Sequence, residues 1–218
     1  MRFTNREDAG RRLANHLASR PFDRPLVIAL PRGGVPVAAE VATRLRAPLD
    51  VLVVRKLGHP QQPELGLGAI TEGNLQILNQ RLITKLGVTP EQLDGVTAIE
   101  VAALKRRVRS YRGDRPPISV RERTVILVDD GLATGFTARA AIEALRQQGA
   151  RLIVLAVPVA PAATMQEMGG LVDQVICLRT PTFLGAIGHW YVDFWPVHDA
   201  EVARVLAEHA TIPRGGAC

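Results

Sequence analysis

Residues 125–137 read Val125-Ile-Leu-Val-Asp-Asp-Gly-Leu-Ala-Thr-Gly-Phe-Thr137. Four apolar residues run straight into two adjacent carboxylates and then into a turn rich in glycine and threonine. Residues 138–145 continue with apolar side chains at helical spacing. The stretch therefore predicts a buried strand, a loop and a helix in direct succession, and the rest of the fold can be built around it.

A loop of this composition can hold a phosphate. Gly131 and Gly135 let backbone N–H groups converge with the helix N-terminus, where unpaired donors and the helix dipole favour an anion, and Thr134 and Thr137 add hydroxyl donors. The two carboxylates would repel a phosphate unless they accept hydrogen bonds from sugar hydroxyls or face Mg²⁺. An ordinary turn with a helix cap explains each residue singly. Their combination in one window favours a site for a sugar phosphate.

The window resembles the phosphoribosyl-pyrophosphate motif of the type I phosphoribosyltransferases, in which four apolar residues precede two acidic residues and a Thr-Gly-x-Thr loop. The resemblance implies that Asp129 and Asp130 hold the ribose 2′- and 3′-hydroxyls, take part in catalysis and face Mg²⁺, directly or through water. It implies that the loop holds the 5′-phosphate, through Gly131, Ala133, Thr134, Gly135, Phe136 and Thr137. A Walker loop is excluded because no Gly-Lys-Ser/Thr occurs.

An earlier strand also ends in a potential anion site. Residues 26–30 are wholly apolar, as in a strand buried on both faces of a parallel sheet, and they lead into Pro31-Arg-Gly-Gly34. A plain turn with a solvated arginine is the alternative. In the family the loop after the first core strand binds pyrophosphate, so the resemblance implies this role for Arg32, Gly33 and Gly34. The family often has a cis non-proline peptide there, which would be Pro31–Arg32.

A third strand, at residues 49–54, leads into Arg55 and Lys56, where related enzymes place cations that bind pyrophosphate and assist catalysis. Residues 57–68 contain two prolines and three glycines with little periodicity, and they predict a mobile loop. This loop resembles the flexible loop that closes over the family's active site. Glu64, within it, is a weakly supported candidate for a catalytic base.

The chain as a whole predicts an α/β fold: a doubly wound, mostly parallel sheet of the type I phosphoribosyltransferase kind, with a small hood. We expect one domain, with its core at about residues 22–178 and a C-terminal hood and helix at residues 179–218. The other expected elements are a capped N-terminal helix from residue 4, helices at 35–46, 79–86, 90–111, 161–168 and 199–210, a hairpin at 67–78, and strands at 151–157 and 171–178. Ligands in such sheets bind at the carboxyl ends of the strands.

Aromatic residues concentrate in residues 181–196, which contain five of the chain's nine. A satellite core that holds down the last helix is one reading. The resemblance offers another, because the family has a variable hood that recognises the nitrogenous base. The base-binding candidates are Phe183, Trp190, Tyr191 and Phe194.

Composition limits the classes of function. Hydrophobic residues make up 47% of the 218 residues, which indicates a globular protein, and no apolar run reaches the roughly 18 residues that span a membrane. Cys177 and Cys218 form no disulfide or metal framework, so we expect a cytoplasmic protein. The net charge of +6 suits a polyanionic partner. The basic cluster at residues 105–112 suits a solvated helix end, with RNA contact as the alternative.

The resemblance implies a Mg²⁺-dependent transfer of ribose 5-phosphate from phosphoribosyl pyrophosphate to a nitrogenous base, with release of pyrophosphate, as in nucleotide salvage. The 6-oxopurine enzymes have Asp before Thr-Gly, whereas this chain has Ala133, as the adenine enzymes commonly do. Two alternatives remain open: a regulatory or RNA-binding relative that keeps the nucleotide site, and a domain that binds phosphoribosyl pyrophosphate without transferring it. A homodimer is compatible with each.

Overall fold

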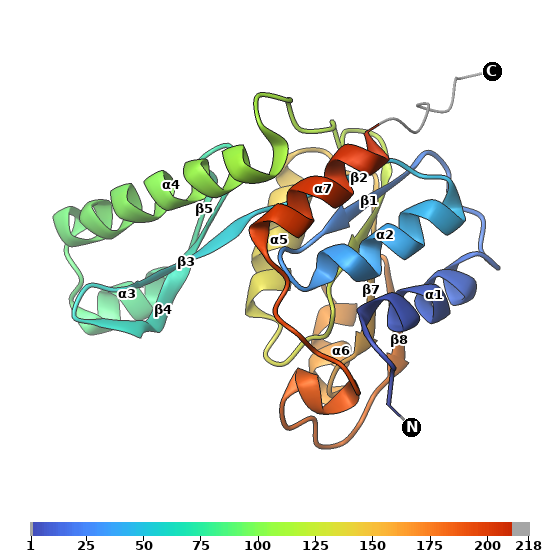
Figure 1. Cartoon of the computed structure of the whole chain (residues 1–218). Coiled ribbons are helices and arrows are strands. Elements are labelled where there is room, and N and C mark those ends of the chain that lie inside the picture. Colours follow the sequence, from blue (N-terminus) through green and yellow to red (C-terminus); the bar gives the residue numbers. More distant parts are fainter. Residues whose placement is uncertain (1, 211–218) are drawn as a thin grey trace.

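A computed structural model describes residues 2–210 and shows a body from which an arm projects (Figure 1). The body is built on a five-stranded parallel sheet in the order β2-β1-β6-β7-β8. Its strands are β2 (Leu49–Val51), β1 (Pro25–Ala29), β6 (Thr124–Val128), β7 (Leu152–Val159) and β8 (Gln174–Arg179). Because all five strands are parallel, the loops that follow them leave from one edge of the sheet.

Helices cover both faces of this sheet (Figure 1). One face carries α1 (Arg6–Leu17), α2 (Gly34–Leu45) and α7 (Asp199–His209), and the other carries α5 (Phe136–Gln147) and α6 (Ala162–Gly169). The side chains of β1 alternate between the two resulting cores: Val27 faces one, and Leu26 and Ile28 face the other. The apolar runs of β1 and β6 are thus buried on both sides, and the predicted doubly wound α/β fold is confirmed.

The arm contains a second, antiparallel sheet and two helices. The sheet has the order β3-β4-β5, with β3 (Val54–His59), β4 (Gln62–Thr71) and β5 (Gln76–Leu78). The helices are α3 (Gln80–Leu86) and α4 (Pro90–Arg112), and α4 runs back along the arm to the body (Figure 1). The chain thus leaves the body after β2 and returns to it before β6.

The prediction of an irregular loop at residues 57–68 is wrong, because these residues form most of the β3–β4 hairpin, and their mobility stays a prediction. Their glycines allow close packing. A Cβ on Gly58 would lie 2.4 Å from the carbonyl oxygen of Pro63, and one on Gly68 would lie 2.3 Å from that of Ile77. Leu57 is fully buried in the main core. Gly58 and Gly68 therefore occur where neighbouring strands of the arm leave no room for a side chain.

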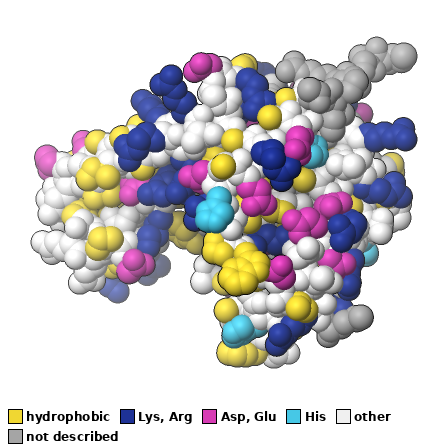
Figure 2. Space-filling model, in the orientation of Figure 1, with side chains coloured by type: hydrophobic (Ala, Val, Ile, Leu, Met, Phe, Trp, Pro, Cys, Tyr) yellow, Lys and Arg dark blue, Asp and Glu magenta, His cyan; other side chains and the backbone are white. Residues whose placement is uncertain are grey.

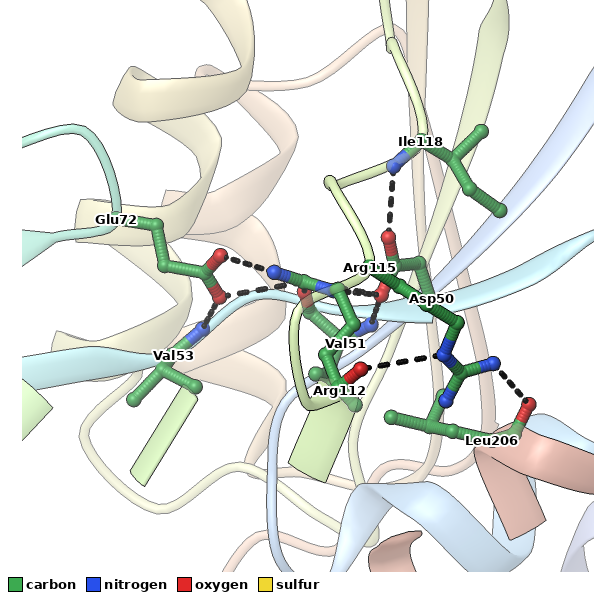
Figure 3. Close-up of polar contacts among 8 residues, drawn as sticks. All are labelled: Asp50, Val51, Val53, Glu72, Arg112, Arg115, Ile118 and Leu206. Carbon is green, nitrogen blue, oxygen red and sulfur yellow. Dashed lines mark hydrogen bonds and ion pairs between the residues drawn. The ribbon is translucent and has the colours of Figure 1, made fainter. Parts of the chain in front are cut away.

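A buried ion cluster joins the arm to the body (Figure 3). The Arg112 guanidinium, at the end of α4, donates from Nε to Asp50 at 3.0 Å, from Nη2 to the carbonyl oxygen of Val51 at 2.9 Å and from Nη1 to Glu72 at 2.7 Å. Asp50 also accepts a hydrogen bond from the Ile118 N–H, and Glu72 accepts one from the Val53 N–H. Arg112 thus connects β2 with the turn that follows β4, and Asp50 adds the segment that returns to the body.

Residues 180–198 pack against the N-terminus. They include the short 3₁₀ helix η1 (Ile187–Trp190), and Phe3 forms a parallel bridge with Tyr191. Phe3, Ala9 and Tyr191 are the buried centre of a small separate cluster. Residues 211–218 of the expected hood, including Cys218, lie outside the described residues. None of the helices within residues 2–210 combines the length and apolar character that a membrane crossing requires.

Candidate functional site

The two glycine-containing loops meet at the carboxyl edge of the sheet. Ala29 and Val128 pair at the ends of β1 and β6, so residues 31–34 and 129–135 leave side by side. A Cβ added to Gly33 would lie 2.0 Å from Oδ2 of Asp130, and one added to Gly34 would lie 2.9 Å from Cα of Asp129. The Gly-Gly turn therefore exists because the acidic pair packs directly on it. The expected cis peptide at Pro31–Arg32 is present.

The loop of residues 131–135 leads into an open helix N-terminus. Gly135 takes the left-handed conformation, with φ of 69°, and no side chain caps α5. Thr134 and Thr137 are exposed, as are Ala133 and Phe136. The loop is also held by α6, because the hydroxyl of Thr164 donates to the carbonyl oxygen of Ala133 at 2.8 Å. Unpaired donors, exposed hydroxyls and a supported loop are the features that bind an anion.

Arg6 is the residue that sequence reasoning missed. It lies on α1, and its Nε donates to Oδ2 of Asp130 at 2.8 Å, with both side chains about nine-tenths buried. Its Nη1 donates to the carbonyl oxygen of Trp195 at 2.8 Å, and its guanidinium carbon lies 3.8 Å from the centre of the Phe194 ring. Arg6 therefore fixes the second carboxylate of the pair from behind.

This contact divides the acidic pair. Asp130 is almost completely buried, holds Arg6 and lies over Gly33, whereas Asp129 is only partly buried and accepts the backbone N–H of Asp130 at 2.8 Å. Burial raises the pKa of Asp129 well above its usual range, and the charge of Asp130 raises it further. Burial also raises the pKa of Asp130, and Arg6 opposes that rise. A cation or hydroxyl donors beside Asp129 would favour its charged form.

The protein side chains at this site could supply only some of the ligands that a magnesium ion needs. Among residues 2–210 no three His, Cys, Asp or Glu side chains come together as a metal site. Mg²⁺ is, however, commonly held by one or two carboxylates together with substrate oxygens. Asp129, which is partly exposed and lies beside a second carboxylate, fits that arrangement.

The predicted cations fall in two places. Arg32 precedes Gly33, the residue that packs against Asp130. Its Nη1 lies 3.7 Å from Oδ1 of Asp199, and its side chain is 44% exposed. Arg55 and Lys56 lie on β3 at the root of the arm and, as strand neighbours, point to opposite faces. Arg55 pairs with Glu100 on α4 at 2.7 Å, and Lys56 pairs with Glu64 at 3.3 Å.

Lys56 also reaches toward the phosphate loop. Gly66 lies between them: a Cβ there would be 3.5 Å from Cδ of Lys56 and 3.8 Å from the ring of Phe136. Glu64, by contrast, has a completely exposed side chain whose ion-pair partner is Lys56. Glu64 lies at the edge of a pocket that Arg55 and Glu100 also line, and nothing in the described residues buries its carboxylate.

The aromatic residues of the predicted hood differ in how far their rings are buried. Tyr191 is buried, and its hydroxyl donates to the carbonyl oxygen of Asp130, so its prediction as a base-stacking residue is wrong. Phe194 stacks on Tyr191 at 4.9 Å and lies against Arg6. Trp190 is partly buried and donates from Nε1 to the carbonyl oxygen of Leu184. Phe183, at 85% exposed, keeps its ring free, as does Trp195 at 78%.

Comparison with known proteins agrees with this geometry. The phosphoribosyl transferase domain family matches residues 3–188. Two proteins of Mycobacterium tuberculosis, "Putative phosphoribosyl transferase Rv0571c" of strain H37Rv and its MT0597 counterpart of strain CDC 1551, are each 45% identical over 204 residues. These cover 94% of this chain and 46% of each relative, so the chain spans about half the length of the curated relatives it matches.

Among solved structures, the crystal structure of TT1426 from Thermus thermophilus superposes with a TM-score of 0.85 at 40% identity, covering 95% of this chain and 99% of that one. The likeness therefore includes both the parallel sheet and the arm. The family match spans the Gly-Gly loop, the acidic pair and the open helix N-terminus together. The chain belongs to the phosphoribosyl transferase domain family.

Proposed function

We propose that the protein binds phosphoribosyl pyrophosphate and transfers its ribose 5-phosphate group to a nitrogenous base, releasing pyrophosphate. The observation that carries the proposal is the direct contact between the Gly-Gly loop and the acidic pair, beside an uncapped helix N-terminus. Each of these parts suits one end of that substrate. Their contact makes them a single site.

We infer the orientation of the substrate from the charges of its groups and of the side chains around the site. The 5′-phosphate binds at the loop of residues 131–137, where backbone N–H groups of the α5 N-terminus and the hydroxyls of Thr134 and Thr137 donate to it. The ribose hydroxyls donate to Asp129, the carboxylate that Arg6 does not hold. Pyrophosphate lies on residues 31–34, within reach of Arg32. We propose that Lys56 joins from the root of the arm, because its side chain extends toward Phe136.

Asp129 and Asp130 are the residues that would hold Mg²⁺, together with oxygen atoms of the substrate. A bound Mg²⁺ would supply positive charge that offsets the charge of the pyrophosphate group. The chain's own contribution is to hold the sugar and both phosphate groups in line and to place Arg32 at the leaving group. Arg6 keeps the acidic loop in position during this process.

The base binds at the rim formed by residues 179–198, the described start of the proposed C-terminal hood. Phe183 and Trp195 offer exposed rings there, and Trp195 is connected to the acidic pair because its carbonyl oxygen accepts from Arg6. Ala133 offers no proton acceptor to a purine ring, which favours an adenine-like base over a 6-oxopurine. Stacking on such a ring is worth about 1–3 kcal/mol per base.

The test is an assay of pyrophosphate release with phosphoribosyl pyrophosphate, Mg²⁺ and a panel of purine and pyrimidine bases. We expect release with one class of base, and we expect Asp129→Asn to abolish it. Asp94→Asn, an exposed carboxylate of α4, is the matched control and should retain full activity. Binding of phosphoribosyl pyrophosphate without release for any base would favour a binding or regulatory protein, and release unaffected by Asp129→Asn would contradict the proposed site.

A further inference from the structure

The basic residues at the end of α4 differ in burial and in their partners. Arg112 is buried in the ion cluster that joins arm and body, whereas Lys105, Arg106 and Arg109 are exposed. Arg107 differs from both groups, because it is half-buried and has no carboxylate at ion-pair distance within residues 2–210. Its position on the helix explains where it points.

Four residues of α4 share one face at spacings of four, three and four: Glu100, Leu104, Arg107 and Tyr111. Leu104 and Tyr111 are buried in the main core, so this face is turned toward the body. Arg107 is the cation on that face. It lies one turn before Tyr111 and two turns after Glu100.

The residues on either side of Arg107 hold the two other arginines of the proposed pyrophosphate end. Glu100 pairs with Arg55 at 2.7 Å. The Tyr111 hydroxyl donates to Oδ1 of Asp199 at 2.9 Å, and Arg32 lies 3.7 Å from the same oxygen. Arg107 therefore stands between an arginine of the arm and the arginine of the Gly-Gly loop.

Helix spacing places Arg107 one turn before Tyr111, whose hydroxyl contacts the same carboxylate oxygen of Asp199 as Arg32 does. Burial and the hydrogen bond to Asp199 raise the pKa of Tyr111, while the positive charges of Arg107 and Arg32 act against that rise. Both guanidinium groups thus lie near one hydroxyl, although they belong to different elements. Figure 2 shows Lys and Arg side chains gathered where the arm joins the body, next to a notch between the two. Cations held close together repel one another unless an anion lies between them.

We propose that Arg107 binds the pyrophosphate group of phosphoribosyl pyrophosphate together with Arg32, so that α4 contributes directly to the substrate site. This inference rests on the proposed function. Pyrophosphate carries more negative charge than one guanidinium offsets, and Asp199 and Tyr111 hold Arg32 where Arg107 can join it. The arm is then a part of the site on both of its sides, with Lys56 on the sheet and Arg107 on the helix.

The experiment measures binding of inorganic pyrophosphate and of ribose 5-phosphate, each by calorimetry with Mg²⁺. Arg107→Gln should weaken pyrophosphate binding by roughly tenfold to a hundredfold, the range expected for a lost hydrogen bond to a charged group. Ribose 5-phosphate binding should stay within about twofold. Arg106→Gln and Arg109→Gln are matched controls on the same helix, and Arg107→Lys should recover part of the loss.

The outcomes separate this inference from the proposed function. Pyrophosphate binding equal in Arg107→Gln and the two controls overturns the role of Arg107, as does an equal loss for both ligands. Wild-type protein that binds ribose 5-phosphate but not pyrophosphate also overturns it. Wild-type protein that binds neither ligand overturns the proposed function and this inference together. Melting curves identify a variant that fails to fold, in which case Arg107→Lys decides.

Discussion

Replacing Arg112 with methionine tests what holds the arm in place. Arg112 and Asp50 have side chains only 5% and 6% exposed, and Glu72 is 13% exposed. Methionine fills a similar volume, but it removes the donors that both carboxylates share with Arg112. Asp50 would keep the N–H groups of Val51 and Ile118, and Glu72 that of Val53, yet two buried negative charges would face each other without a cation.

Breaking a buried ion pair by removing one partner costs about 3–5 kcal/mol. For a domain of this size each kcal/mol shifts the melting temperature by about 2–4 °C, so Arg112→Met should melt roughly 6–20 °C below the wild type. Adding Asp50→Asn to Arg112→Met removes one of the two uncompensated charges. The double variant should therefore recover part of the loss.

The assay is thermal and urea unfolding of four proteins: wild type, Arg112→Met, Arg112→Met with Asp50→Asn, and Arg109→Met. Arg109 is exposed on the same helix, so its replacement should change stability by no more than about 0.5 kcal/mol. An Arg112→Met protein as stable as Arg109→Met would refute the reasoning, because the cluster would then contribute nothing to joining the arm. Failure of Asp50→Asn to recover any stability would show that the loss does not come from unpaired charge.

Three further predictions concern the acidic pair. Because the pKa of Asp129 is raised, the folded protein holds this proton more tightly than the unfolded chain does. The free energy of unfolding therefore falls as the pH rises from about 4, the ordinary pKa, through the raised pKa. Asp129→Asn should accordingly melt at a higher temperature than wild type at pH 7, and a lower melting temperature would contradict this. Gly33→Ala puts a Cβ 2.0 Å from Asp130 Oδ2 while leaving the φ of −60° allowed, so we expect about 1–3 kcal/mol of destabilisation in urea and weaker pyrophosphate binding, whereas wild-type values in both assays would refute the contact. Arg6→Met should cost about 3–5 kcal/mol by leaving Asp130 buried without its cation; a loss no larger than that of the exposed control Arg11→Met in the same urea titration would show that Arg6 is dispensable.

The sequence was sufficient for the body and the motif loops because their signals are local. A strand buried on both faces must be apolar throughout, and the runs at residues 26–30 and 125–128 have no other plausible place in a globular fold. The Gly-Gly turn was predicted from the residues that follow the strand, and the cis peptide that the family resemblance implied is present. Both inferences use residues that are adjacent in the chain.

The hairpin was misread because glycine has two uses. Its content predicted mobility at residues 57–68, but Gly58 and Gly68 are glycines because neighbouring backbone carbonyls approach to within 2.4 Å of where a Cβ would be. Nothing in the local pattern distinguishes these causes. Leu57 and Leu67 are buried, which only the folded structure shows.

Arg6 could not be predicted because its partner Asp130 lies 124 residues away. The N-terminal helix showed an ordinary apolar face, and an arginine beside it is usually solvated. The same holds for Tyr191, whose place in a cluster with Phe3 depends on how the N-terminal segment packs against residues 180–198. Such long-range polar contacts follow from the packed fold, and no spacing in the sequence encodes them.

The most direct test of the central claim is the binding of phosphoribosyl pyrophosphate to wild type, Asp129→Asn and Asp94→Asn by calorimetry in the presence of Mg²⁺. The account predicts one site per chain in wild type, unchanged affinity in Asp94→Asn, and affinity at least about tenfold weaker in Asp129→Asn, a change of about 1.4 kcal/mol. Unchanged affinity in Asp129→Asn, or no binding to the wild type, would contradict the assignment of the acidic pair as the sugar-binding part of the site.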